Sequence, residues 1–136
     1  MRLALSALAL VALSTGCSRA PTGLAAEVPG SSWTLERVVD ADGTVLRGDG
    51  DRVTFAPDGA LTLASCNACS GRYSVREDVL TVEGPLACTA RACAPGAVEL
   101  ERYLGGASAL RRDGAYLVAE SAGGAQVLLV PAGSGR

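Results

Sequence analysis

The body of the chain alternates apolar and polar residues in short runs that are separated by turn-forming residues. The stretch "DRVTFAPDGALTLAS" has apolar residues at alternate positions on both sides of Pro57-Asp58-Gly59, a pattern that predicts a β-hairpin. The same form recurs in "GRYSVREDVLTVEG", with a turn near Glu77-Asp78, and in "ALRRDGAYLVAES", with a turn at Asp113-Gly114. Near the end, "AQVLLVPA" predicts one more strand.

One segment has helical spacing instead. Pro95 suits the first turn of a helix, Ala97, Leu100 and Leu104 recur on one helical face, and Gly105 suits its end. A single short helix must bury its apolar face against a sheet. We therefore predict an α+β fold, in which a small antiparallel β-sheet or partly open barrel carries one short α-helix packed on it.

The first residues have the layout of a secretory signal peptide. Arg2 precedes an uncharged, largely apolar run over residues 3–15, and Gly16 then precedes Cys17. The run is shorter than the roughly 20 apolar residues that a membrane helix needs. The stretch "LSTGC" resembles a bacterial lipobox, which implies that Cys17 becomes the first mature residue and carries lipid. The alternative is an ordinary cleaved signal peptide with an unmodified cysteine.

These features divide the chain into four predicted parts. Residues 1–16 form the signal peptide, and residues 17–30 form a flexible tether after the lipidated cysteine, since this stretch is rich in small residues and lacks apolar periodicity. A domain is expected over residues 31–132 and a disordered tail over 133–136. The expected location is the bacterial cell envelope, with the outer membrane or cell surface favoured, and the lipid on Cys17 is expected to hold the chain to the membrane.

The composition narrows the possible functions. The 136 residues include no histidine and no lysine, which excludes serine–histidine and cysteine–histidine catalysis, histidine zinc sites and Schiff-base chemistry. The basic residues are scattered arginines and the formal net charge is −2, so nucleic-acid binding is not expected. We expect a monomeric domain with no enzymatic activity, no cofactor and no bound metal.

Four cysteines in two blocks, Cys66 with Cys69 and Cys88 with Cys93, allow three interpretations. They could form a zinc site of four thiolates, a redox-active CxxC pair, or two structural disulfides. Export to an oxidising compartment favours disulfides. The flanks of the CxxC pair are predicted antiparallel strands, whereas a redox pair normally opens a helix beside a parallel sheet.

A register argument ranks the possible disulfide pairings. If the two cysteine blocks run antiparallel, the residue numbers of each bonded pair should have nearly the same sum. The sums differ by two when Cys66 bonds Cys93 and Cys69 bonds Cys88, and they differ by eight when the pairs cross. The argument therefore favours the nested pairing.

Taken in order, five stretches resemble the META domain family of HslJ-like lipoproteins: "WTLERV", "VTFAPDGALTLASCN", "SGRYS", "LACTARAC" and "LVAESAGGAQVLLV". The resemblance covers about residues 32–131, and its more specific residues are Cys66, Asn67, Gly71, Tyr73, Thr89 and Cys93. Cys66 and Cys93 match the two cysteines of the family, which agrees with the nested pairing. Cys69 and Cys88 are additional to the commoner pattern.

The resemblance implies a small envelope or surface domain, often lipid-anchored, without an established catalytic activity. We therefore predict a binding or structural module, related to stress and stabilised by disulfides, with a protein of the envelope as its expected partner. The alternative is an inhibitor of an exported enzyme, such as a lysozyme or a protease, and a third class is a thiol oxidoreductase. Trp33, Phe55 and Tyr73 are expected in the core, and Asn67 is expected to be a turn residue that bonds its own backbone.

Overall fold

The computed structural model describes residues 16 and 19–133, so Cys17, residues 1–15 of the predicted signal peptide and residues 134–136 of the predicted tail lie outside it. The elements in chain order are α1 (Leu24–Glu27), β1 (Ser31–Val39), β2 (Val45–Arg47), β3 (Arg52–Phe55), β4 (Ala60–Ala64), β5 (Ala68–Arg76), β6 (Val79–Cys88), α2 (Leu100–Leu104), β7 (Gly106–Asp113), β8 (Tyr116–Ser121) and β9 (Gln126–Pro131). Within the described residues, no helix has the length and hydropathy to cross a membrane.

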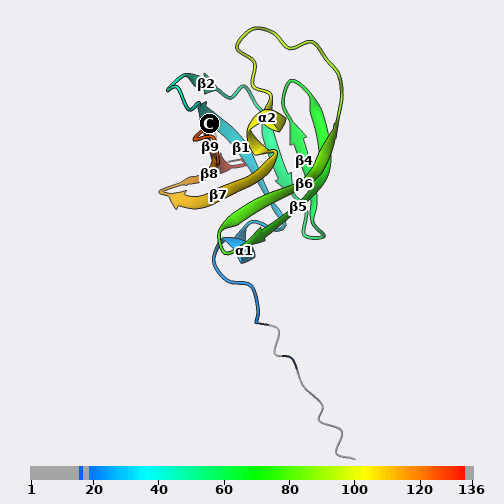
Figure 1. Cartoon of the computed structure of the whole chain (residues 1–136), viewed down its shortest axis with the longest axis vertical. Coiled ribbons are helices and arrows are strands. Elements are labelled where there is room, and N and C mark those ends of the chain that lie inside the picture. Colours follow the sequence, from blue (N-terminus) through cyan, green and yellow to red (C-terminus); the bar gives the residue numbers. More distant parts are fainter. Residues whose placement is uncertain (1–15, 17–18, 134–136) are drawn as a thin grey trace, which may run out of the picture.

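The strands form one antiparallel sheet that closes into a barrel (Figure 1). Neighbouring strands follow the order β2-β1-β3-β4-β5-β6-β7-β8-β9, and β9 pairs with β1 along its whole length. Strand β2 pairs with Arg37–Val39 of β1, beside the place where β3 pairs with Ser31–Thr34, so β2 is an addition to the closed ring. The prediction of a partly open barrel was wrong on this point, because the pairing of β9 with β1 leaves no opening between them.

The hairpins predicted from turn-forming residues are confirmed. Strands β3 and β4 pair on either side of Pro57-Asp58-Gly59, β5 and β6 on either side of Glu77-Asp78, and β7 and β8 on either side of Gly114. Glu77 and Asp78 both have positive φ angles, 48° and 60°. Such angles are required at both central residues of a two-residue type I′ hairpin turn, whose twist matches that of the strands.

Alternate side chains of the strands fill the barrel. The pattern is clearest in β3 and β4, where Val53, Phe55, Leu61 and Leu63 are each 1% exposed or less. The Phe55 ring meets the Tyr73 ring edge to face, with 4.9 Å between centroids. The other strand side chains of the core are those of Trp33, Leu35, Val38, Cys69, Leu80, Val82, Leu110, Leu117, Ala119, Val127 and Leu129. Val118 and Leu128 are buried but do not belong to this cluster. The three aromatic residues expected in the core are therefore buried.

The helices differ from the prediction, and the fold is mostly β. Two short helices are present among the described residues instead of one. The predicted helix is confined to α2, since its first turn starts at Leu100 and the chain from Pro95 to Glu99 has no helical structure. Its buried residues, Leu100 and Leu104, lie four apart and pack into the barrel.

The second helix, α1, falls inside the segment predicted to be a flexible tether. Leu24 is 7% exposed and Val28 is fully buried, and both belong to the hydrophobic core. The two residues lie one helical turn apart, so a single turn brings both into the barrel. Residues 24–28, which were predicted as part of the tether, are therefore packed on the barrel through this pair of apolar residues.

Candidate functional site

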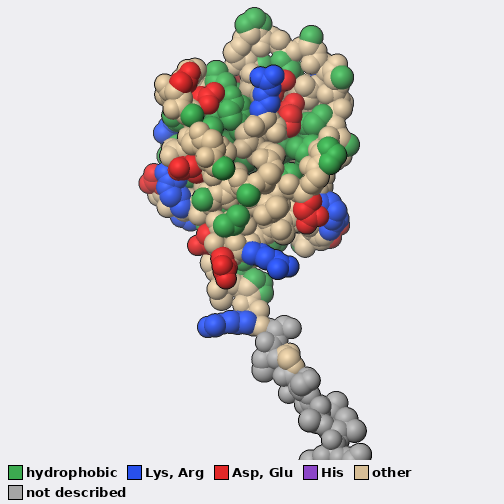
Figure 2. Space-filling view, viewed as in Figure 1, with side chains coloured by type: hydrophobic (Ala, Val, Ile, Leu, Met, Phe, Trp, Pro, Cys, Tyr) green, Lys and Arg blue, Asp and Glu red, His purple; other side chains and the backbone are tan. Residues whose placement is uncertain are grey.

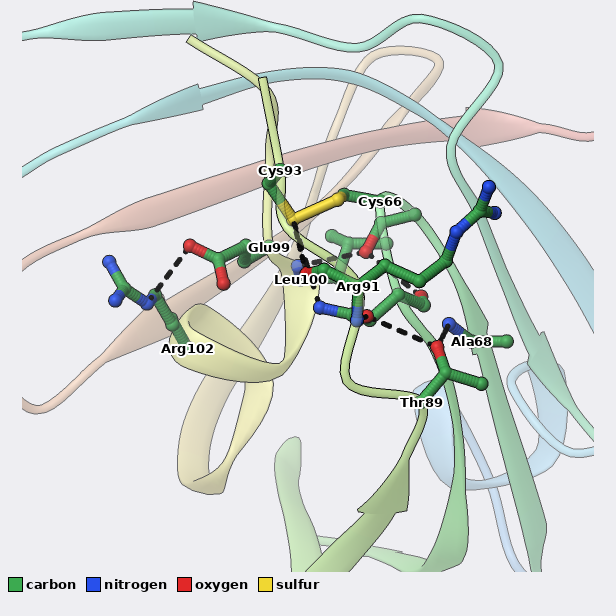
Figure 3. Close-up of a disulfide and its surroundings, with 10 residues drawn as sticks. Cys66, Ala68, Thr89, Arg91, Cys93, Glu99, Leu100 and Arg102 are labelled. Carbon is green, nitrogen blue, oxygen red and sulfur yellow. Dashed lines mark hydrogen bonds and ion pairs between the residues drawn. A yellow bond between two sulfur atoms is a disulfide. The ribbon is translucent and has the colours of Figure 1, made fainter. Parts of the chain in front are cut away.

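The connection between β6 and α2 is the longest irregular segment of the described chain. We call residues 88–98 the stapled loop; apart from Cys93 and Val98, its side chains are exposed. The loop reads "CTARACAPGAV", so its apolar side chains are mostly small, and only Val98 belongs to the hydrophobic core. Its position is fixed instead by covalent and polar bonds to residues 65–69, which form the turn between β4 and β5 and the start of β5. Figure 3 shows the Cys66–Cys93 bridge and the polar contacts around it.

Two disulfides join the loop to this turn in the nested arrangement. Cys66 bonds Cys93, with 5.7 Å between their Cα atoms. Cys69 bonds Cys88, and these two residues face each other directly across β5 and β6. The expectation of disulfide bonds is confirmed. Because all four cysteines are paired, the structure contains neither the four-thiolate zinc site nor the CxxC redox pair that the sequence also allowed.

Asn67 has a different role from the one predicted. Its side-chain oxygen, Oδ1, accepts hydrogen bonds from the Thr89 hydroxyl at 3.1 Å and from the Arg91 backbone N–H at 2.8 Å. The residue is 6% exposed. The prediction that Asn67 bonds its own backbone was wrong, because the folded loop offers donors that are distant in sequence and lie directly above it.

Thr89 and Gly71 contribute to the same region. The Thr89 hydroxyl accepts a hydrogen bond from the Ala68 backbone N–H at 3.1 Å while it donates to Asn67. Gly71 lies at a β-bulge in the pairing of β5 with β6, and a Cβ atom there would come within 2.4 Å of the Leu86 side chain. A side chain at residue 71 would therefore require the end of the Leu86 side chain to move.

The far end of the stapled loop is tied to α2. The backbone N–H of Leu100 donates to the Ser65 hydroxyl at 3.3 Å, and the backbone N–H of Cys66 donates to the Val98 carbonyl at 3.5 Å. Glu99 and Arg102 form an ion pair at 3.2 Å across the first turn. The turn that holds the loop through disulfides therefore also fixes the start of the helix.

An open cleft of about 430 Å³ lies between the stapled loop and the connection from β2 to β3. Its lining combines loop residues 94–98 and Cys66 with three charged side chains, those of Arg47, Asp49 and Asp51. Arg47 also pairs with Glu36 at 3.7 Å. The sequence analysis did not identify these charged residues, although the glycine-rich, charged stretch "RGDGDR" signals an exposed turn. The cleft offers polar contacts of both signs and no paired nucleophile and base.

The opposite end of the barrel is built differently. Glu27 of α1 forms an ion pair with Arg112 at 3.3 Å, and the Arg112 guanidinium lies over the Trp33 ring, 5.3 Å from its centroid. The Trp33 ring nitrogen donates to the Ser31 hydroxyl at 2.7 Å. Arg112 thus joins α1 to the barrel wall through both an ion pair and a cation–π contact.

Comparisons with known proteins place the chain in a family. Two structures determined by NMR have the same fold: a protein from Burkholderia xenovorans, with a TM-score of 0.63 and 18% sequence identity over 93% of this chain and 99% of that one, and a second protein, with a TM-score of 0.63 and 19% identity over 82% of this chain and 97% of that one. No functionally curated protein matches the sequence. The META domain family matches residues 26–134, a span that includes every strand of the barrel and the stapled loop. The chain therefore belongs to the META domain family.

Proposed function

We propose that the chain is a lipid-anchored META domain of the bacterial cell envelope that binds a protein partner through the stapled loop and the adjacent cleft, without catalysis. One observation carries the proposal. The chain enters the barrel beside α1, whereas the stapled loop lies at the opposite end of the molecule (Figure 1). If Cys17 is held at a membrane, the loop faces away from it and is accessible to a partner.

The rigid backbone of the stapled loop favours binding of a partner protein. Its backbone is held by two disulfides and by the Asn67 and Thr89 hydrogen bonds, so a partner need not order it, and the entropic cost of association is lower. Its exposed side chains are mostly small, which lets another surface come close. Charged side chains of both signs are scattered over the molecular face in Figure 2, and this distribution favours a specific polar contact over broad attraction to nucleic acid.

The anchor is tested by replacing Cys17 with serine. The Cys17→Ser chain should leave the membrane fraction or remain an uncleaved precursor, because it has no thiol to acylate. The matched control is Ser18→Ala, which should fractionate like the natural chain. A processed Cys17→Ser chain that stays with the membrane would show that the anchor is not a lipid on this residue.

The binding face is tested by site-specific photo-crosslinking in intact cells. A photoreactive residue at Ala94, on the stapled loop, should give a discrete crosslinked product. The same residue at Arg111, which is exposed on β7 near α1, should give none. Equal products from both positions, or products from Arg111 alone, would contradict the proposed face.

A second candidate, inhibition of an exported enzyme, is favoured by the exposed Arg91 side chain. Its backbone N–H is already bonded to Asn67, and Figure 3 shows its guanidinium directed away from the disulfide. A rigid loop that presents one arginine could fill an acidic specificity pocket of a protease. Inhibition of trypsin that is lost in Arg91→Ala and kept in Arg102→Ala would support this candidate, while inhibition of lysozyme would point to a different contact.

A further inference from the structure

The carboxylate of Glu101, in the first turn of α2, has an unexplained environment. Its Oε2 atom is buried and has no hydrogen-bond partner, and among the described residues only the Ser108 hydroxyl shares this condition. A buried carboxylate oxygen without a partner lowers stability, because it has lost its hydration without replacement. The Cys69–Cys88 bridge lies beside this carboxylate, and it suggests what the missing partner is.

Three potential metal ligands meet at this point. The Sγ atoms of Cys69 and Cys88 and a carboxylate oxygen of Glu101 all lie within 4.8 Å of one another. Zinc bonds of about 2.0–2.3 Å at tetrahedral angles would need ligand atoms roughly 3.3–3.8 Å apart. The three groups come from two hydrogen-bonded strands and a helix packed on the core, so small side-chain rotations would be enough to bring them to one ion.

The two disulfides differ in how easily a reductant can reach them. Cys88 is exposed, whereas its partner Cys69 is 2% exposed. In the outer bridge, Cys66 and Cys93 are both partly buried, and the side-chain nitrogen of Asn67 lies 3.7 Å from the Cys93 sulfur. A thiolate can attack only a sulfur that it can approach. Cys88 is therefore the most exposed of the four bonded cysteines, and we expect a reductant to attack the inner bridge first.

We propose that Cys69, Cys88 and Glu101 form a binding site for a thiophilic divalent cation such as Zn²⁺, which becomes available when the inner disulfide is reduced. A dithiol reductant supplies two electrons and two protons, is itself oxidised to a disulfide, and leaves two thiols on the domain. The cation then displaces both thiol protons and is held by two thiolates and the carboxylate, with solvent in the fourth position. The outer bridge stays closed and keeps the stapled loop in place.

The site is tested in the full chain with Cys17, Cys66 and Cys93 replaced by serine, so that only the inner pair of thiols remains. After reduction and removal of the reductant, Co²⁺ should bind one ion per chain with a sulfur-to-cobalt charge-transfer band, and Zn²⁺ should displace it. Glu101→Gln should weaken binding at least tenfold, because one of three ligands is lost. The matched control, Glu99→Gln, should leave the affinity unchanged. Absence of the band, or equal affinity in Glu101→Gln, would overturn the site.

A second measurement does not depend on removing the outer bridge. The Cys17→Ser chain is exposed to a graded dithiol, and its thiols are alkylated and mapped by mass. Cys69 and Cys88 should be alkylated first. Added Zn²⁺ should slow that alkylation in the Cys17→Ser chain, and it should not do so when the same chain also carries Glu101→Gln. Earlier opening of the Cys66–Cys93 bridge, or alkylation that Zn²⁺ does not slow, would contradict the proposal.

Discussion

The two ends of the barrel are closed by different means. At one end, α1 inserts Leu24 and Val28 into the core, and Arg112 joins Glu27 to Trp33. At the other end, the stapled loop inserts only Val98 into the core and is held by two disulfides and the Asn67 side chain. The α1 end is stabilised by burial, and the loop end by cross-links that leave its surface exposed.

The way in which each end of the barrel is held determines whether its side chains stay exposed. A segment that is held by burying its own side chains cannot also present them, whereas a segment held by its backbone and by cysteines keeps its outer face free. This division is consistent with the loop end as the interacting end of the domain. It also predicts that mutations at the two ends will respond to different conditions.

The largest effect is expected from removing a disulfide at the loop end. Replacing Cys66 and Cys93 together with serine should lower the free energy of unfolding by about 3–4 kcal/mol, since the bridge closes a loop with a sequence separation of 27 residues. Replacing Cys69 and Cys88, which are separated by 19 residues, should lower the free energy of unfolding almost as much. The difference between the two bridges is expected to be only a few tenths of a kcal/mol. Denaturant unfolding with and without reductant measures both, and reductant should have no further effect when both bridges are absent.

A smaller effect is expected at the α1 end. Leu24→Ala should destabilise the domain by about 2–3 kcal/mol, through lost burial and a cavity, in oxidising and reducing conditions alike. Ala26→Ser, on the exposed side of the same helix, is the matched control and should be nearly neutral. If Leu24→Ala were also neutral, α1 would not be closing the barrel in solution.

Asn67 tests the polar part of the loop end. Asn67→Ala removes the acceptor of both the Thr89 hydroxyl and the Arg91 N–H, and it should cost about 1–2 kcal/mol because the freed donors can partly bond water. Amide hydrogen exchange should increase in the stapled loop and stay unchanged in α1. Thr89→Ser keeps the hydroxyl and should retain most of the protection. Faster exchange that spread evenly over the barrel would show that Asn67 does not act locally.

The smallest effect concerns Tyr73, whose hydroxyl donates to the Ala56 carbonyl at 2.6 Å, near α1. Burial, assisted by the negative charge of Asp58, raises the pKa of Tyr73 above its ordinary value of 10.0. The stabilisation of the fold that this raised pKa represents is therefore fully present below pH 10, and it is lost as the pH rises through the pKa of Tyr73 in the folded state. Tyr73→Phe should cost about 1 kcal/mol at neutral pH and flatten the alkaline slope of thermal stability. If the slope were unchanged in Tyr73→Phe, ionisation of Tyr73 would not be the cause of the alkaline loss of stability.

The strands and hairpins could be predicted because their signals are local. Alternation around Pro57-Asp58-Gly59 and Asp113-Gly114 identifies both the strands and their turns. Closure of the barrel could not be predicted, since it depends on the pairing of β1 with β9, which no local pattern encodes. The start of α2 was placed too early because Pro95 fits a first helical turn as well as it fits a loop.

The candidate site was predictable only in its cysteines. The spacing of the cysteines fits two antiparallel segments only when the pairs are nested, and the structure has this antiparallel register and these pairs. The role of Asn67 depends on donors that lie 22 and 24 residues away, and a single sequence shows no link between them. The place of Glu101 could not be predicted, because a helical pattern does not reveal that one of its carboxylate oxygens lies beside a disulfide.

The pairing of β1 with β9 also determines when the domain can fold. The first strand needs the last as its neighbour, as in the pairing of Trp33 with Pro131, so the contact that completes the barrel is among the most distant in the chain and is expected to form slowly. During synthesis at about 5–20 residues per second, the barrel cannot close until β9 has been made. A chain that ends before β9 exposes two unpaired strand edges, and its expected fate is aggregation with other incomplete chains.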